Sequence, residues 1–257
     1  LVMASDPDAD RVGAAVKNNE GEWVLLNGNQ TALMFVYYLI TRWKELGKIN
    51  GKEYIVKTIV TTETIKTIAE RNGVEMYDVY TGFKWIANVM RENEGKKNYI
   101  GGGEESYGFL CEDFVRDKDA VSACVILAEI AAWAKDQGLS LYQLLQKIYV
   151  EYGFSKEKGI SVVKKGKSGA EEIEAMMKKF RENPLTEIAG SKVTYFYDYS
   201  TLKGKDYAEN ETVTLDMPTT SNVLQYFTED NTKVSIRPSG TEPKIKFYCE
   251  VHSKVKS

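Results

Sequence analysis

The sequence predicts an α/β fold: a domain of βαβ units with a mixed, largely parallel sheet, followed by a smaller α+β domain. Two observations support this. Short β-rich segments alternate with helical segments between residues 54 and 100, which is typical of parallel strands connected through helices. Beyond Gly153 the pattern changes to one amphipathic helix and several short strands. We therefore expect a change of domain near this residue.

The expected elements of the first domain follow from hydrophobic periodicity. Apolar residues recur at helical spacing between Asn27 and Gly47, with Asn29 as the expected N-cap and Gly47 as the stop. Next we expect a strand, helix, strand, helix and strand, in that order, at residues 54–60, 62–72, 74–80, 83–94 and 98–100. Long helices are expected at residues 119–137 and 141–151.

The second domain is expected to contain one helix and a set of short strands. The helix is predicted at residues 170–182, where apolar residues have helical spacing. The strands are predicted at residues 193–199, 212–215, 223–228, 233–237 and 245–251.

Composition narrows the class of protein. The chain has 257 residues, 43% of them hydrophobic, and a net charge of −3, so it can bury a core and has no global basic field for nucleic acid. No stretch reaches the roughly 20 uncharged apolar residues of a membrane helix. Its three cysteines lack metal-ligand spacing, which favours a reducing, cytoplasmic compartment. We expect small phosphorylated metabolites as ligands, without nucleic acid or membrane partners.

The acidic loop, residues 6–11, is the most specific motif. Asp6, Asp8 and Asp10 alternate beside Arg11, and oxygen ligands of this kind bind hard cations such as Mg²⁺. An EF-hand is excluded because its loop needs glycine at the sixth place and glutamate at the twelfth, where this chain has Arg11 and Lys17. The alternative is a solvated acidic turn that caps a helix.

The Arg237 loop, residues 237–243, follows a predicted strand and combines a guanidinium, hydroxyls and a glycine. Arg237 can bind a phosphate bidentately, Ser239 and Thr241 can donate hydrogen bonds, and Gly240 allows the backbone to approach an anion. This pattern predicts a phosphate-binding loop. The alternative is a hairpin loop rich in turn residues.

Three further segments lie where ligands gather in α/β sheets. The Glu104 loop, residues 103–108, follows the strand predicted at 98–100, and Glu104 and Ser106 could bind sugar hydroxyls. Residues 81–85 follow a strand and open a helix, so Thr81 and the backbone could bind an anion or a hydroxyl. Residues 116–119, including Lys118, could add a cation. Each segment also has a purely structural explanation when it is taken singly. The Glu104 loop could be a glycine-rich turn, residues 81–85 could be a helix cap, and residues 116–119 could be an ion-paired helix start.

Taken together, these five loops resemble, in order, those of the α-D-phosphohexomutases, the phosphoglucomutase and phosphomannomutase superfamily. The resemblance implies an enzyme that moves a phosphoryl group between the C1 and C6 oxygens of a hexose through a phosphoserine and a bisphosphorylated intermediate. Arg11 would lie beside the transferring group. The resemblance implies that Mg²⁺ would be bound by Asp6, Asp8 and Asp10, and that the sugar hydroxyls would be bound by Glu104 and Ser106. Further substrate contacts would come from Thr81 and Lys118. The phosphate that is not reacting would be bound by Arg237, Ser239, Gly240 and Thr241.

The resemblance also implies that parts of the mutase are missing. The family's phosphoserine loop is not present in these residues. We therefore expect residues 1–26 to be a remnant of domain 2 with the metal loop, residues 27–153 to be domain 3, and residues 154–257 to be domain 4. The missing N-terminal domains would be this chain's partners in the full-length protein, and the chain alone is predicted to be inactive.

The residues near the predicted sugar site favour glucose 1-phosphate as the substrate. Family members that act on both mannose and glucose phosphates commonly have histidines where this chain has Phe83 and the stretch 107–109. A phosphomannomutase or phosphopentomutase of the same family is the alternative. Two other classes stay open: a haloacid-dehalogenase-type phosphatase with Asp6 as nucleophile, which Asp10 and the Arg237 loop argue against, and a sugar-phosphate binding module.

Overall fold

The computed structural model describes residues 1–164, 166–240 and 242–255. Most of the chain divides into two compact units, Leu1–Phe154 and Ser155–Ser253, which we call unit 1 and unit 2. None of the helices in the described ranges is long and apolar enough to cross a membrane. The three-domain division expected from the sequence stays a prediction.

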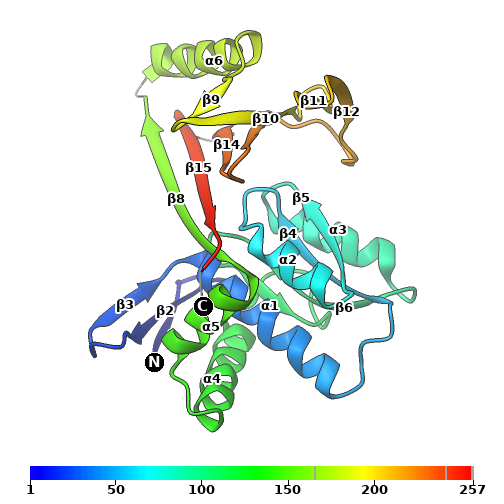
Figure 1. Ribbon diagram of the computed structural model, residues 1–257, viewed down its shortest axis with the longest axis vertical. Helices are drawn as coiled ribbons and strands as arrows, with labels where there is room; N and C mark the ends of the chain where they lie inside the picture. Colours follow the sequence, from blue (N-terminus) through cyan, green and yellow to red (C-terminus); the bar gives the residue numbers. More distant parts are fainter. Residues whose placement is uncertain (165, 241, 256–257) are drawn as a thin grey trace. The chain divides into compact units, whose positions relative to one another are not determined.

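Unit 1 is built around a four-stranded mixed sheet (Figure 1). Its strand order is β5-β4-β6-β7. The strands are β4 (Glu53–Thr58), β5 (Glu75–Val79), β6 (Asn98–Gly103) and β7 (Phe109–Cys111). Because β4 pairs in parallel with both β5 and β6, and only β7 is antiparallel, the predicted α/β fold class is confirmed.

Helices cover both faces of this sheet. Alternate strand residues face opposite sides, and the two sides have separate cores. Ile55 and Ile100 pack with α1 (Gly28–Glu45), α2 (Thr64–Arg71), α4 (Ala120–Asp136) and α5 (Leu141–Tyr152). Tyr54 and Val56 pack with α3 (Phe83–Asn93). The carboxyl ends of β4 and β6 continue into loops, and ligands commonly bind at such strand ends in α/β sheets.

The start of α1 corrects the predicted cap. Asn27, rather than Asn29, is the N-cap: its side chain accepts from the Gln30 N–H, and the Gln30 side chain accepts from the Asn27 N–H. Asn29 is buried and accepts a hydrogen bond from the Thr62 N–H at 2.9 Å. Both asparagines stand before an apolar repeat, so sequence alone did not separate them. The predicted stop is confirmed, because Gly47 has a φ of 67°.

The end of β6 also differs from the prediction. The sequence placed Gly101–Gly103 in a loop after the strand, but the strand continues through Gly103. A Cβ on Gly102 would lie 2.4 Å from the carbonyl oxygen of Val56, and one on Gly103 would lie 2.5 Å from the Phe109 ring. These glycines are therefore explained by close packing within the sheet, and not by a turn.

A three-stranded antiparallel sheet precedes α1 and carries the acidic loop. It consists of β1 (Val2–Ser5), β2 (Val12–Lys17) and β3 (Trp23–Leu26), in the order β1-β2-β3. The loop at residues 6–11 connects β1 to β2 and is closed by a hydrogen bond from the Asp6 N–H to the Arg11 carbonyl. The acidic loop is therefore a strand connection.

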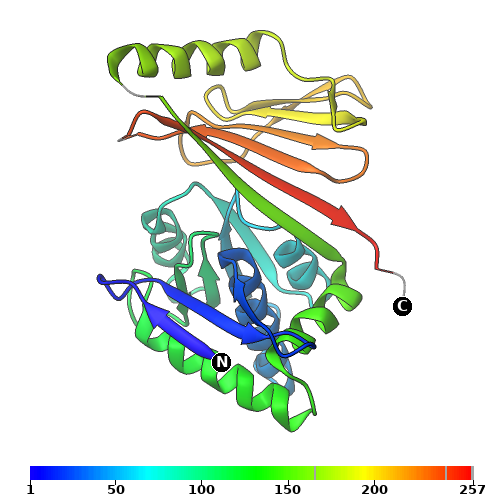
Figure 2. The ribbon, with the colours of Figure 1, turned by 90° about the vertical axis from the view of Figure 1, so that its left-hand side faces the viewer.

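In its described residues, unit 2 is an α+β unit with one long antiparallel sheet and one helix (Figure 2). The helix α6 (Gly166–Glu182) packs Ile173 and Met177 onto the sheet core. The strand order is β12-β11-β10-β13-β14-β15-β8, with β9 beside β10. The strands are β8 (Phe154–Val163), β9 (Glu187–Ile188), β10 (Ser191–Asp198), β11 (Lys203–Asp206), β12 (Glu211–Thr214), β13 (Leu224–Thr228), β14 (Lys233–Pro238) and β15 (Lys244–Ser253).

Candidate functional site

Backbone contacts within unit 1 bring the acidic loop, the Glu104 loop and residues 116–120 together. Arg11 forms an isolated antiparallel bridge with Gly108. The Val12 N–H donates to the Tyr107 carbonyl at 3.2 Å, and the Ala120 N–H donates to the Ala9 carbonyl at 3.0 Å. Segments about 100 residues apart in the sequence therefore meet at one place.

The acidic loop is a tight turn held by Asp6. Oδ1 of Asp6 accepts hydrogen bonds from the Asp10 and Arg11 N–H groups at 3.1 and 3.2 Å. Desolvation opposes ionisation, but these backbone donors outweigh it and lower the pKa of Asp6. Ala9 has a φ of 55°, an uncommon conformation for a residue with a side chain. Asp6 therefore shapes the loop, while Asp8 lies exposed.

Asp10 and Lys118 form the central ion pair of this region. Lys118 Nζ lies 2.6 Å from Oδ2 of Asp10 and 3.3 Å from Oδ1 of Asp117. Burial alone would lower the pKa of Lys118, whose side chain is 13% exposed, but the two carboxylates raise the pKa overall. Lys118 therefore carries its positive charge throughout the neutral pH range.

The donor atoms of the acidic loop suit a hard cation. Oδ1 of Asp10 is buried and accepts no hydrogen bond within the described part of the chain, so it is a carboxylate oxygen that a cation could satisfy. No group of three or more carboxylate, histidine or cysteine side chains gathers as a metal site among the described residues. The assignment of all three aspartates as Mg²⁺ ligands stays a prediction.

The Glu104 loop is tied to the loop at residues 81–85 by Glu104 itself. This side chain is only 6% exposed, and its Oε1 accepts from the Gly82 N–H at 2.8 Å. The Glu104 N–H donates to the Gly108 carbonyl at 2.9 Å, which closes the loop. Ser106 and Thr81 are half-buried. The structure thus places Glu104, Ser106 and Thr81 on two adjoining loops.

Gly108 and Tyr107 shape the region where this loop meets Lys118. A Cβ on Gly108 would lie 2.5 Å from Cδ of Lys118 and 3.5 Å from Oε2 of Glu104. A side chain here would therefore clash with the side chain of Lys118. Tyr107 is 40% exposed with a φ of 72°, the kind of backbone strain that often occurs at functional sites.

A cavity of about 480 Å³ adjoins the acidic loop. Asp6, Arg11 and Tyr107 line it together with largely apolar residues of β1, β2 and β3. The combination of an apolar wall with a few polar groups is typical of small-molecule sites. Sequence reasoning did not identify this wall, because β1–β3 were not predicted as a sheet.

In unit 2, the Arg237 loop is the connection between β14 and β15. The Ser239 N–H donates to the Lys244 carbonyl at 2.8 Å, and Ser239 Oγ accepts from the Glu242 N–H at 3.2 Å. Nε of Arg237 is buried and has no hydrogen-bond partner in the described ranges, so it could donate to an anion. The Thr241 position lies outside the described residues.

Comparison with known proteins identifies the family. Residues 27–152 match the phosphoglucomutase/phosphomannomutase alpha/beta/alpha domain III, and residues 161–256 match the C-terminal domain of the same family. Together these regions cover most of the chain. The chain belongs to the phosphoglucomutase/phosphomannomutase family.

Individual relatives agree with this result. A phosphoglucomutase of Staphylococcus aureus (strain MRSA252) is 38% identical over 251 residues, which are 98% of this chain and 44% of that protein. The structure of pp63/parafusin, a phosphoglucomutase of Paramecium in its open form, matches with a TM-score of 0.66 and 18% identity over 99% of this chain and 41% of that one. The chain therefore spans less than half the length of these relatives.

A third match comes from a complex. The Aspergillus fumigatus N-acetylphosphoglucosamine mutase, solved with GlcNAc-6P and magnesium, has a TM-score of 0.53 and 12% identity over 98% of this chain and 48% of that one. At this level of identity the similarity shows a shared fold.

The sequence did not identify the residues that contact the Glu104 loop from the carboxyl end of β4. Thr58, at the end of β4, donates to Oε2 of Glu105 at 3.2 Å. Its position at the carboxyl end of a parallel strand was the available signal. The run Thr61-Thr62-Glu63-Thr64 follows soon after this strand and has three hydroxyls in four residues, but residues 62–64 were predicted only as the start of a helix and Thr61 was given no role.

Proposed function

We propose that the full-length protein is a phosphohexomutase that interconverts glucose 1-phosphate and glucose 6-phosphate through a phosphoserine and a bisphosphate intermediate. The observation that carries the proposal is the meeting of Asp10, Lys118 and the Glu104 loop in unit 1, with the Asp10–Lys118 pair at 2.6 Å and Arg11 bridged to Gly108. The 38% identity to a phosphoglucomutase supports the same reaction.

In this proposal, Arg11 and Lys118 stabilise charge on the phosphoryl group. Lys118 stays protonated because its carboxylate partners raise its pKa, and a fixed positive charge in a partly buried site favours the charge that develops during transfer. Asp6, Asp8 and Asp10 would hold Mg²⁺, which would neutralise phosphoryl oxygens when bound. The acidic loop would therefore supply the anionic groups for a cation and, in Arg11, one cationic group for a phosphate, while Lys118 would supply a second cationic group from another segment.

Glu104, Ser106 and Thr81 would bind the sugar. Glu104 uses Oε1 to accept from the Gly82 N–H, so its other oxygen is the one we assign to a sugar hydroxyl. Because the loop at residues 81–85 and the Glu104 loop share this contact, sugar binding at one loop would order the other. Orientation of the hexose relative to Arg11 would follow from this shared contact.

The Arg237 loop would hold the phosphate that is not reacting. Arg237, Ser239, Gly240 and Thr241 are the residues we assign to this role, and the unpartnered Nε of Arg237 supports it. Binding a remote phosphate contributes to orienting the reacting end of the same molecule. This role predicts binding that weakens with salt, because it depends on charge.

Two measurements test the proposal on the chain itself. Because the family's phosphoserine loop is not in these residues, we predict no conversion of glucose 1-phosphate by the purified chain in a coupled assay, free of host mutase. We predict that glucose 1-phosphate binds, and binds more tightly with Mg²⁺. Turnover by the chain alone would refute the first prediction, and absence of binding with and without Mg²⁺ would refute the second.

A related mutase specificity is the alternative. Phe83, the first residue of α3, is buried in the core, so its identity cannot select the sugar by direct contact, whereas Tyr107 is exposed on the Glu104 loop. Mannose 1-phosphate and ribose 1-phosphate should therefore be titrated beside glucose 1-phosphate. Tighter binding of either would assign the protein as a phosphomannomutase or a phosphopentomutase.

A further inference from the structure

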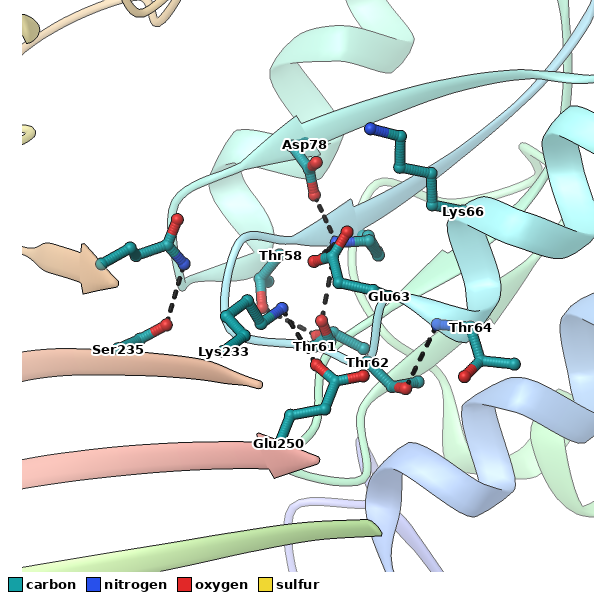
Figure 3. A network of polar contacts seen from close by, with 12 residues as sticks. Thr58, Thr61, Thr62, Glu63, Thr64, Lys66, Asp78, Lys233, Ser235 and Glu250 are labelled. Carbon is teal, nitrogen blue, oxygen red and sulfur yellow. Dashed lines mark hydrogen bonds and ion pairs between the residues drawn. The ribbon is translucent and has the colours of Figure 1, made fainter. Parts of the chain in front are cut away.

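A cluster of buried threonines lies at the carboxyl end of β4 (Figure 3). Thr58, Thr61, Thr62 and Thr64 are each no more than 1% exposed. Buried hydroxyls cost free energy unless they form hydrogen bonds. The hydrogen bonds of these hydroxyls therefore show which residues the end of β4 and the loop after it keep in place.

Lys57 fixes the path of the loop that follows β4. Its side chain is 1% exposed, and Nζ lies 2.6 Å from Oδ1 of Asp78 and 3.0 Å from Oε1 of Glu63. Nζ also donates to the carbonyl oxygen of Thr61 at 3.5 Å. An ammonium buried among these three acceptors ties Thr61 and Glu63 to the sheet.

The hydroxyls of Thr61 and Thr58 form a directed chain that ends at Glu105. Oγ1 of Thr58 lies 2.8 Å from Oγ1 of Thr61 and donates to Oε2 of Glu105 at 3.2 Å. A hydroxyl has a single proton, and a carboxylate can only accept. Thr58 therefore gives its proton to Glu105, and Thr61 donates to Thr58.

The main chain of Glu105 is held from another side by the first turn of α1. A Cβ on Gly28 would lie 2.0 Å from the carbonyl oxygen of Glu105 and 2.8 Å from the Tyr107 nitrogen. In the same turn, the Asn29 side chain accepts from the Thr62 N–H at 2.9 Å. The start of α1 therefore contacts both the loop after β4, at residues 59–63, and the Glu104 loop.

We propose that Thr58 and Thr61 are positioning residues that set the conformation of the Glu104 loop by anchoring Glu105, and through it the affinity for the sugar. Glu105 is an anchor and does not bind the sugar directly. Glu104 and Ser106, which precede and follow Glu105 in the sequence, are the residues that would bind the sugar. The inference deepens the proposed function and rests on it for the identity of the ligand, while the anchoring itself does not depend on any ligand.

The first test measures amide hydrogen exchange in the chain without ligand. The reporters are the Glu104 N–H, bonded to the Gly108 carbonyl, and the Val12 N–H, bonded to the Tyr107 carbonyl. Thr58→Val removes the hydroxyl at nearly constant shape and should speed exchange of both amides on the order of tenfold. Thr58→Ser keeps the hydroxyl and should restore protection.

Thr64→Val is the matched control. Thr64 is as buried as Thr58, but its hydroxyl makes no hydrogen bond among the described residues. Its removal should leave both amides protected. Unchanged exchange in Thr58→Val, or an equal increase in Thr64→Val, would overturn the proposal.

The second test measures binding. Thr58→Val should weaken glucose 1-phosphate binding on the order of tenfold and Thr58→Ser should recover it, while affinity for inorganic phosphate stays unchanged in all variants. A purely structural role would weaken both ligands together or neither, and either result would contradict sugar positioning. If the unmodified chain binds no glucose 1-phosphate, the proposed function fails, and hydrogen exchange alone then decides on the anchor.

A second variant covers the case in which Thr58→Val does not fold. Glu105→Ala removes the acceptor at the other end of the contact and should expose the same two amides. Glu105→Gln keeps an accepting oxygen and should expose them less. Equal exchange in Glu105→Ala and the unmodified chain would exclude Glu105 as an anchor.

Discussion

The acidic and Glu104 loops of unit 1 differ from the Arg237 loop of unit 2 in how their residues are held. In unit 1, Asp10, Lys118 and Glu104 come from distant segments and contact one another or a neighbouring loop. In unit 2, Ser239 and Lys244 contact residues of the same β-hairpin, and a backbone hydrogen bond from the Lys164 N–H to the Pro243 carbonyl at 2.8 Å joins this loop to a more distant segment. Substitutions in the first region should therefore affect stability and binding together, whereas those in the second should affect binding alone.

The largest expected effect is a loss of stability when one of two glycines, Gly28, is replaced by alanine. Gly28→Ala would place a Cβ 2.0 Å from the carbonyl oxygen of Glu105, so we expect a loss of about 1–3 kcal/mol in the free energy of unfolding. Gly240→Ala is the control, because a Cβ there meets no atom of the described residues within 4 Å. Urea denaturation measures both. Equal stability of the two variants would remove the distinction between the regions.

Removal of Lys118 comes next in size. Lys118→Met leaves Asp10 without its ion-pair partner at 2.6 Å. Because Asp10 is 26% exposed, we expect a loss of about 1–2 kcal/mol, below that of a fully buried pair. Binding of glucose 1-phosphate should weaken in the same variant, as calorimetry can show. Unchanged stability and unchanged binding would contradict the role of the pair.

The same lysine predicts a pH dependence. Its pKa is raised above the ordinary value of 10.5, so its contribution to stability is complete below pH 10.5 and is lost as pH rises through the higher folded-state pKa. Melting temperatures from pH 8 to 12 should fall more for the unmodified chain than for Lys118→Met in the alkaline part of the range. Parallel curves would show that Lys118 is not responsible.

Arg237→Met should change binding with little change in stability. Because Nε of Arg237 has no partner among the described residues, its loss removes no hydrogen bond to that nitrogen, and we expect less than about 0.5 kcal/mol. Affinity for inorganic phosphate should fall on the order of tenfold and lose part of its salt dependence. Unchanged phosphate affinity would exclude Arg237 as the anion-binding residue.

The smallest effect concerns Asp6. Its pKa is lowered, although desolvation opposes this, because the backbone donors of Arg11 and Asp10 favour the carboxylate. Its stabilisation is therefore present above pH 3.8 and is lost as pH falls through the lower folded-state pKa. Asp6→Asn should melt slightly lower than the unmodified chain at pH 7 and at nearly the same temperature at pH 2. An equal difference at both pH values would contradict this assignment.

Sequence patterns predicted the fold where the periodicity was strong. Strand and helix alternation between residues 54 and 100 gave the α/β class, and the change beyond Gly153 gave the α+β unit. The strand β8 was missed because most of its residues are exposed and several are charged, so it lacks an apolar alternation. Gly101–Gly103 were read as a turn, since sequence cannot show that Val56 and Phe109 pack against them.

For the site, the sequence predicted the loops that carry candidate binding residues, but not the contacts that hold these loops in place. Local sequence patterns were enough to identify the alternating Asp6, Asp8 and Asp10 and the hydroxyl and glycine residues that follow Arg237. The pairing of Asp10 with Lys118 joins residues 108 positions apart, and no local pattern reports such a contact. The Thr58–Glu105 contact was missed for the same reason, because it depends on how the end of β4 lies beside the Glu104 loop.

The most direct test of the central claim is an NMR titration of the chain with Mg²⁺ and then with glucose 1-phosphate. We predict that Mg²⁺ shifts the amide signals of residues 6–11, and that glucose 1-phosphate then shifts those of residues 6–11 and 104–108 together. Mg²⁺ shifts confined to other acidic surfaces, or sugar-phosphate shifts that leave both loops unchanged, would contradict it.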